Sequence, residues 1–207
     1  MRLGSLEPRT VTEDFCRRTA ELPNLCPHFH LSLQSGCDAT LARMNRKYDS
    51  ARYYQSVELL RVYFHDPAVT TDLIVGFPGE TEEQFQDTMS LVKEVGYDSA
   101  FTFIYSPRTG TRAAAMDGQI DEAVATDRIQ RLIALQDQCQ KEAMARFLGQ
   151  EEEVLVEGLS RRSDTAVSGK GRHGVSITLP GTEEDVGRIV RVRVTEIKNN
   201  TLMAERL

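Results

Sequence analysis

The sequence has few cysteines, and they are widely separated. Cys16, Cys26, Cys37 and Cys139 form no CxxC or CxxxCxxC group in a chain of 207 residues. This spacing excludes a disulfide-stabilised scaffold and a zinc or iron–sulfur site built from one short loop, because both need clustered thiols. We therefore expect free thiols that are mostly buried, as free cysteine commonly is.

Long apolar runs and a large net charge are also absent. No stretch approaches the roughly 18 apolar residues of a membrane span, and Met1 opens no signal sequence. We therefore expect a cytoplasmic protein without a membrane partner. The net charge of −6 excludes a generic polyanion binder. One segment is locally basic, because Asp164 is the only acidic residue within 161–173, and this indicates nucleic-acid binding. Its basic residues are Arg161, Arg162, Lys170, Arg172 and His173.

Residues 1–147 alternate between strand-like and helix-like segments. Apolar runs of strand type lie at 1–7, 29–33, 69–77 and 100–105. Helical spacing and capping residues predict helices between and after them, at 12–20, 38–45, 50–64 and 81–96. Repeated strand–loop–helix units indicate a parallel α/β sheet or a β/α barrel, and about four strands are too few to close a barrel. The predicted class is α/β, as an open sheet, a partial barrel or a barrel whose first part is missing.

A second module follows a long helix predicted over 121–148, which Gly149 ends. Beyond it the apolar period changes to two: Val190, Val192 and Val194 alternate with Arg191 and Arg193, and glycines punctuate the segment. Short strands with glycine turns predict a small β-barrel. The predicted domains are 1–147, the sheet part with its linking helix, and 148–207, the β-barrel.

Candidate ligand residues follow from the rule that parallel α/β proteins bind ligands where their strands end. Three strand ends carry amide, carboxylate, hydroxyl and glycine groups: Gln34, Ser35, Gly36, Asp72, Gly76, Tyr105 and Ser106. Glycine lets a ligand approach the backbone, and a helix N-terminus favours polar or anionic groups. Together these ends suit an adenosyl cofactor, although ordinary βα turns use the same residue types.

His28 and His30 raise a metal alternative, because an HxH pair on a barrel strand ligates metal in some hydrolases. Both stand at the start of their strand, at the edge opposite the expected site, with no HxxxH or acidic partner near them in sequence. We therefore predict no metal site in this chain. A metal-dependent hydrolase ranks third among the functional alternatives, after the two that are given below.

Three motifs resemble those of the radical-SAM tRNA methylthiotransferases. They are LQSG at 33–36 with LARMNR at 41–46, DLIVGFPGE at 72–80, and FIYSPRTGT at 103–111. Residues 149–207 resemble the TRAM domain of that family, a five-stranded RNA-binding β-barrel. The resemblance covers nearly the whole chain in order. It implies the C-terminal half of a radical-SAM β/α barrel, a partial TIM barrel, followed by a small OB-like TRAM barrel.

The resemblance implies methylthiolation at C2 of a modified adenosine beside the tRNA anticodon. It also implies S-adenosylmethionine and 4Fe–4S clusters as cofactors, and tRNA as partner. On this basis we expect cofactor binding by Gln34, Ser35, Gly36, Arg46, Asp72, Gly76, Tyr105 and Ser106. We expect RNA binding by Arg108, Arg161, Arg162, Lys170, Arg172, Arg191 and Arg193. The resemblance assigns no catalytic residue.

The modified base stays open between two forms. The stretches SGCDATL and RLGSLEP favour N6-threonylcarbamoyladenosine, whereas YDSAFTFIYS and the TRAM segment favour N6-isopentenyladenosine.

The CxxxCxxC loop that holds the family's radical-generating cluster is not in this sequence. Met1 is expected near the third strand of the family's barrel, which would make the chain a fragment that is inactive alone. A non-catalytic RNA-binding module acting through the β-barrel is the second functional alternative. An unpaired first strand would expose an edge that pairs with the missing half or with another copy of the chain.

Overall fold

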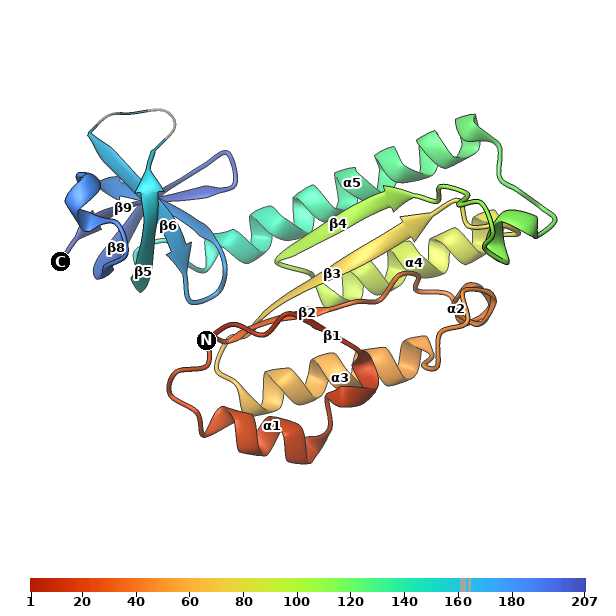
Figure 1. The fold of residues 1–207 in the computed structure, drawn as a ribbon, viewed down its shortest axis with the longest axis horizontal. Helices are drawn as coiled ribbons and strands as arrows, with labels where there is room; N and C mark the ends of the chain where they lie inside the picture. Colours follow the sequence, from red (N-terminus) through yellow and green to blue (C-terminus); the bar gives the residue numbers. More distant parts are fainter. Residues whose placement is uncertain (161–162, 164) are drawn as a thin grey trace.

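The computed structural model describes residues 1–160, 163 and 165–207, as a sheet part and a barrel part joined by a long helix (Figure 1). The sheet part holds four parallel strands in the order β1-β2-β3-β4. Their bounds are β1 Ser5–Leu6, β2 His28–Leu31, β3 Ala68–Val75 and β4 Ser99–Ile104. The predicted α/β class, with a partial β/α barrel, is confirmed.

Helices pack on one face of the sheet (Figure 1). They are α1 Glu13–Ala20, α3 Ser50–Tyr63, α4 Glu82–Val95 and α5 Glu122–Ala145, while the short α2 Asp38–Arg43 lies beyond the end of β2. Local chemistry sets their ends: the Thr12 hydroxyl accepts from the Phe15 N–H to start α1, and Thr81 with Gln84 forms the predicted capping box of α4. The covered face of the sheet forms the core with Phe29, Leu31, Leu73 and Val75, all fully buried.

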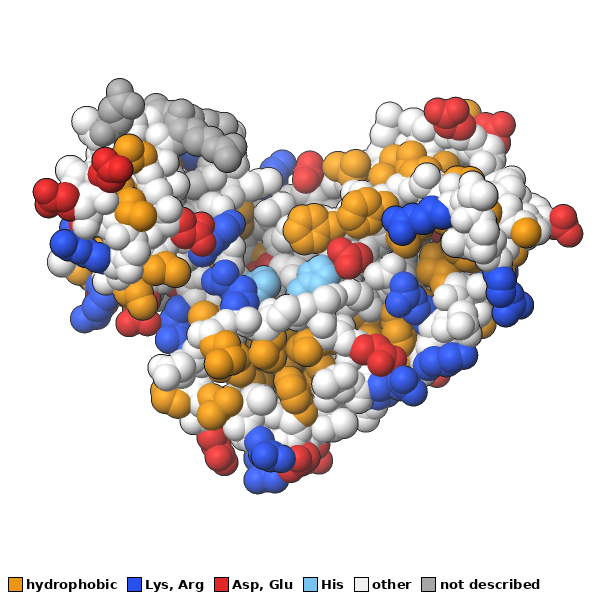
Figure 2. Space-filling model, in the orientation of Figure 1, with side chains coloured by type: hydrophobic (Ala, Val, Ile, Leu, Met, Phe, Trp, Pro, Cys, Tyr) orange, Lys and Arg blue, Asp and Glu red, His pale blue; other side chains and the backbone are white. Residues whose placement is uncertain are grey.

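The opposite face of the sheet remains open. Because side chains alternate along a strand, the neighbours of the core residues point to this face, among them His30, Asp72, Phe101 and Phe103. Phe101 and Phe103 are 57% and 51% exposed. Figure 2 shows hydrophobic and histidine side chains together in the hollow between the sheet part and the barrel part. The open face is therefore available to a ligand or to another chain.

The barrel part closes as β5-β6-β7-β9-β8. Its strands are β5 Glu151–Leu159, β6 Ala166–Gly171, β7 Ser176–Pro180, β8 Ile189–Lys198 and β9 Thr201–Arg206. The predicted alternation holds: Val192 and Val194 are buried, whereas Arg191 and Arg193 face outward. Gly169 permits the closest strand approach, because a Cβ there would lie 2.0 Å from the Leu155 carbonyl oxygen.

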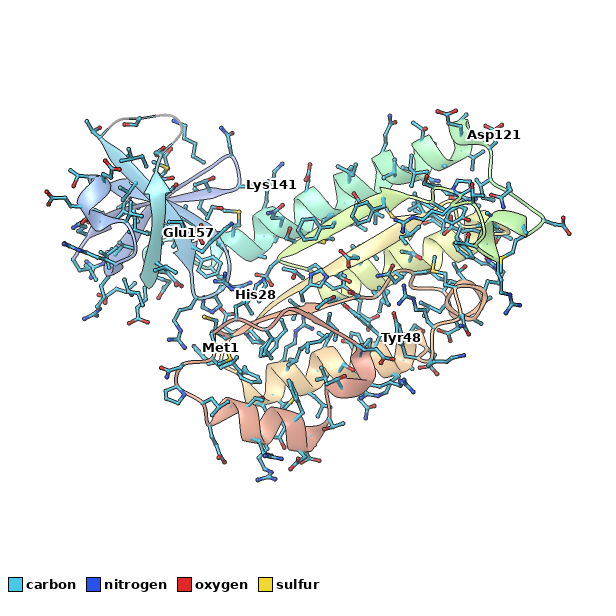
Figure 3. All side chains as sticks on the ribbon, in the orientation of Figure 1. Met1, His28, Tyr48, Asp121, Lys141 and Glu157 are labelled. Carbon is cyan, nitrogen blue, oxygen red and sulfur yellow. The ribbon has the colours of Figure 1, made fainter. Side chains whose placement is uncertain are left out.

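Two segments of the barrel part dock on the sheet part. In the turn between β6 and β7, Arg172 donates to the carbonyl oxygens of Pro23 and Leu25 at 3.1 and 2.9 Å. Gly174 of the same turn lies so close to His28 that a Cβ would meet the ring Cδ2 at 2.7 Å. Figure 3 places His28 at this junction.

The C-terminal end of α5 makes a second set of contacts between the sheet part and the barrel part. Met144 and Phe147 pack in the apolar core of the barrel, and Arg146 binds Asp98 of the sheet part at 2.6 Å. Side chains near the predicted boundary thus contact both the sheet part and the barrel part. The boundary at 147/148 stays a prediction.

The first strand is shorter than predicted. Of residues 1–7, only Ser5–Leu6 form β1, and Pro8 opens a 3-10 turn, η1 Pro8–Thr10, directly after it. Proline has no N–H to donate to a ladder, which ends the strand there. β1 pairs with β2 on one side and forms an edge of the described sheet. Self-association through this edge stays a prediction.

Candidate cofactor pocket and RNA-binding surface

The pocket lies where β2, β3 and β4 end, at the edge that the sequence predicts. Its volume is about 570 Å³. It is lined by Gln34, Asp72, Ile74, Phe103, Ile104, Tyr105, Ser106, Arg108, Thr111 and Ala113. A volume of this order holds a small organic ligand.

Gln34 lines the pocket, and its backbone is strained. Its φ of 76° lies in the left-handed region, which costs a residue other than glycine about 1–3 kcal/mol. Two ladder bonds hold it there: its N–H donates to the Asp72 carbonyl at 2.8 Å, and its carbonyl accepts from Ile74 at 2.9 Å. The strain turns the chain out of β2 and keeps the Gln34 side chain 7% exposed at the pocket.

Asp72 is held from one side. Its Oδ2 accepts from His30 Nε2 at 3.1 Å and from the Ser32 hydroxyl at 3.2 Å. Among the described residues no donor reaches Oδ1, and the side chain is 30% exposed. A carboxylate with one oxygen saturated and one free can accept a hydrogen bond from a ligand.

Tyr105 contributes a hydroxyl without a partner. The phenol oxygen is buried and makes no hydrogen bond to any described residue, while its ring packs edge-on against Phe77 with centroids 5.0 Å apart. An unsatisfied buried hydroxyl costs free energy unless something pairs with it. Its position in the pocket lining makes a ligand a suitable partner.

A buried ion pair supports the loop behind the pocket. Glu80 Oε2 accepts from the Gly76 N–H at 2.8 Å and from Arg128 Nη1 at 2.9 Å, and the two side chains are 1% and 5% exposed. Burial raises the pKa of the Glu80 carboxyl, and the Gly76 and Arg128 bonds act in the opposite direction. The pair ties α5 to the end of β3, so the loop that follows Gly76 keeps its shape.

Half of the expected cofactor-binding residues line this pocket, namely Gln34, Asp72, Tyr105 and Ser106. The other half do not line it. Ser35 and Gly36 bond to the Thr88 hydroxyl and seat the loop on α4. Gly76 lies under α5, and Arg46 is exposed on the loop after α2. Cofactor contact by any of the eight stays a prediction.

Several lining residues were missed from the sequence: Ile74, Phe103, Ile104, Thr111 and Ala113. Strand parity could have found the first two, because Ile74 shares the face of Asp72 and Phe103 that of Tyr105. Thr111 and Ala113 come from an irregular loop, which gives no such periodic signal.

The expected RNA-binding residues separate into different environments. Arg108 lines the candidate cofactor pocket rather than the barrel. Arg191 and Arg193 point outward from β8, and both pair with Glu151, at 2.7 and 2.9 Å. Lys170 donates to the Ser176 hydroxyl. Arg172 is engaged at the junction. Arg161 and Arg162 lie outside the described residues.

Neither the cysteines nor the histidines gather into a metal site. Cys16, Cys37 and Cys139 are buried as predicted, and they belong to separate elements. In the described part of the chain, no three His, Cys, Asp or Glu side chains lie close enough to hold a metal ion. The His28 ring lies against Gly174 of the barrel turn, and His30 Nε2 lies 3.1 Å from Asp72 Oδ2, so the hydrolase alternative gains no support from these neighbours.

Two family models match the chain. The one described as Radical SAM superfamily matches residues 4–92, and the one described as TRAM domain matches residues 145–207. A tRNA-2-methylthio-N(6)-dimethylallyladenosine synthase of Thermoanaerobacter sp. is 39% identical over 205 residues, 99% of this chain and 44% of that protein. A synthase of the same name from Moorella thermoacetica is 42% identical over 205 residues, 99% of this chain and 46% of that protein. The chain belongs to the radical-SAM tRNA methylthiotransferase family.

The methylthiotransferase chain spans a little under half the length of these curated relatives. A solved structure, "Coproporphyrinogen III oxidase (HemN) from Escherichia coli is a Radical SAM enzyme", aligns with a TM-score of 0.53 at 22% identity, over 65% of this chain and 31% of that chain. This likeness shows the fold alone. None of the described helices combines the length and apolar character needed to cross a bilayer.

Proposed function

We propose that this methylthiotransferase chain contributes to the 2-methylthiolation of a modified adenosine in tRNA. The observation that carries the proposal is the pocket at three strand ends, in a chain that is about 40% identical to named synthases over 99% of its length. The pocket would hold the adenosyl cofactor, and the barrel would bind the RNA. Such a division matches the family models, which separate a radical-SAM part from a TRAM part.

The pocket lining fits S-adenosylmethionine, the cofactor that the family implies. The Asp72 carboxylate complements the cofactor's positive charge, and the exposed face of Phe103 offers a ring for stacking or a cation–π contact. The Tyr105 hydroxyl offers a hydrogen bond that no described residue uses. When bound, the cofactor supplies the family's radical chemistry. The residues of this chain would hold it, orient it and exclude water from it.

The described cysteines do not fit a 4Fe–4S cluster, because such a cluster needs thiolates converging on one point. They belong to separate elements and form no metal-binding group. We therefore assign no step through a cluster to these residues. Anaerobic reconstitution of the chain with iron and sulfide is expected to give no iron–sulfur absorbance. A reducible cluster on this chain would contradict this part of the proposal.

The open face favours N6-dimethylallyladenosine, the isopentenyl form, over N6-threonylcarbamoyladenosine. Phe101 and Phe103 present apolar rings there, which suit a hydrocarbon substituent. The neighbouring Asp72 carboxylate would repel the carboxylate of a threonylcarbamoyl group. The two relatives described above are named as synthases of the dimethylallyl form, which agrees with this preference.

Binding of an anticodon stem-loop tests the RNA part of the proposal. We expect the affinity to fall steeply with salt, and removal of one phosphate contact to lower the slope of log affinity against log salt by about 0.7–0.9. Arg191→Ala should do so, while Arg18→Ala on the far helix α1 should not. Glu151→Gln should raise the affinity, because it frees Arg191 and Arg193 from their carboxylate partner. Binding that is absent or insensitive to salt would overturn this part.

A non-catalytic RNA-binding module remains the second candidate, and the dispersed cysteines favour it. The two candidates differ in ligand binding. Binding of S-adenosylmethionine at the pocket supports the enzyme part, whereas stem-loop binding without any cofactor binding supports the module.

A further inference from the structure

His30 lies on the open face of the sheet with both ring nitrogens engaged. Nδ1 lies 3.1 Å from Thr70 Oγ1, and Nε2 lies 3.1 Å from Asp72 Oδ2. Thr70 and Asp72 are successive same-face residues of β3, so the ring spans two positions of the neighbouring strand. The ring is 16% exposed and packs beside Phe101 with centroids 6.1 Å apart. These contacts fix its position and its plane.

The proton arrangement of this group follows from the chemistry of its members. An ionised carboxylate only accepts, so Nε2–H donates to Asp72, and in a neutral ring Nδ1 accepts the Thr70 hydroxyl proton. The Ser32 hydroxyl donates to the same Oδ2 and is itself held by Ser5 at 2.9 Å. Both donors therefore meet one carboxylate oxygen. The other oxygen, Oδ1, has no donor among the described residues.

The alternative role for His30, a purely structural link between β2 and β3, does not account for this asymmetry. The ladder already joins the two strands at this level, where His30 pairs with Thr70. A histidine that served only to join strands would not need a partly exposed carboxylate in the pocket wall. A carboxylate with one oxygen held by two donors and the other without a described donor suits ligand binding, because the second oxygen is fixed in direction before the ligand arrives.

We propose that His30 is a positioning residue for the pocket: it holds Asp72 so that Oδ1 accepts a hydrogen bond from a hydroxyl or amino group of bound S-adenosylmethionine. The inference rests on the proposed cofactor site. His30 itself does not line the pocket, and it acts through Asp72 alone. Removing the His30 imidazole should therefore weaken S-adenosylmethionine binding only through the lost restraint on the Asp72 carboxylate.

Titration of S-adenosylmethionine into the 207-residue chain, followed by NMR, tests this role. His30→Phe keeps a ring of similar size and loses the donor, and we expect it to weaken binding about tenfold. His30→Gln can place an amide N–H near the position of Nε2 and should recover part of the loss. His65→Phe changes an exposed histidine outside the group and should bind as the unmodified chain does. Melting temperatures verify that each variant is folded.

A double-mutant cycle separates positioning from a general effect on the pocket. If His30 acts through Asp72, the variant with both His30→Phe and Asp72→Asn binds no more weakly than Asp72→Asn alone. Additive losses, or unchanged binding by His30→Phe, would overturn the role of His30 while leaving the cofactor site in place. If the unmodified chain binds no S-adenosylmethionine, the proposed cofactor site fails, and the role of His30 fails with it.

Discussion

The Arg172 guanidinium donates a hydrogen bond of 2.9 Å to the carbonyl oxygen of Leu25, across the junction of the two parts. A second bond of 3.1 Å reaches the Pro23 carbonyl, and Glu153 lies 3.4 Å away on the barrel side. The side chain that the sequence places in a basic RNA-binding group thus serves to dock the barrel on the sheet. Because docking sets the distance between barrel and pocket, Arg172 would affect RNA binding without touching a phosphate.

Replacing Arg172 should loosen this docking. Arg172→Met keeps the aliphatic stem and removes both carbonyl contacts, so we expect a larger radius of gyration by small-angle X-ray scattering. Stem-loop affinity should fall with an unchanged salt slope, since no phosphate contact is lost. Arg191→Met, an exposed arginine of the same barrel, is the matched control and should leave the radius unchanged. A reduced salt slope for Arg172→Met would show that Arg172 contacts RNA directly.

His28 should make stability depend on pH at the junction. Burial, together with electrostatic repulsion from Arg2, His30 and His173, lowers the pKa of His28 from 6.5 to about 4. As pH falls from 6.5 towards 4, the unfolded chain binds a proton that the folded chain does not, so stability is lost over that window. After a discount for partial exposure, we expect a loss of about 1–2 kcal/mol.

Chemical denaturation at pH 7 and pH 4.5 measures this loss. His28→Gln should remove most of the difference between the two pH values, whereas His65→Gln, at an exposed position, should retain it. Equal pH dependence in the His28→Gln variant and the unmodified chain would rule out His28 as the source.

The ion pair between Arg128 and Glu80 should be costly to break. Arg128→Met leaves the Glu80 carboxylate buried without its partner, and we expect a loss of about 3–5 kcal/mol in the free energy of unfolding. Arg131→Met removes an exposed pair with Glu82 from the same helix and should cost less than about 1 kcal/mol. Urea denaturation of both variants provides the comparison, and equal losses would contradict it.

Tyr105→Phe should weaken ligand binding without lowering the stability of the unliganded chain. Deleting a buried hydroxyl that bonds to no described residue should leave the unliganded chain equally stable, or up to about 1 kcal/mol more so. S-adenosylmethionine affinity should nevertheless fall, about threefold to tenfold. Tyr48→Phe is the contrast, because the Tyr48 hydroxyl donates to the Ser32 and Leu33 carbonyls and its loss should destabilise the chain. Unchanged affinity in Tyr105→Phe would place the ligand away from this hydroxyl.

Much of the fold was predictable because its signals are local. The Thr12 cap, the Thr81 and Gln84 capping box and the stop at Gly96 lie where the sequence indicates. The apolar period changes after Gly149, shortly before β5 begins at Glu151, since period two requires strands with one buried face. The strand ends were predictable for the same reason, as each follows an apolar run.

The composition of the site was less predictable, because it depends on contacts between distant segments. Ser35 and Gly36 follow a strand end, yet they bond to Thr88 of α4. His30 stands near the start of its strand, where the sequence indicates a structural role. Its partners Thr70 and Asp72 lie some forty positions away, and only the register of β2 against β3 brings them together.

The sequence by itself determined the order of elements, the two modules and the family motifs, since periodicity, caps and motifs are properties of neighbouring residues. Tertiary structure decided which polar groups act together. Strand register places both described donors on one oxygen of Asp72. Docking of the barrel places the Arg172 guanidinium against the Leu25 carbonyl rather than on the basic surface. The physical reason is the same in both cases: a hydrogen bond extends about 3 Å, so a polar side chain acquires its role from whatever folding places within that distance.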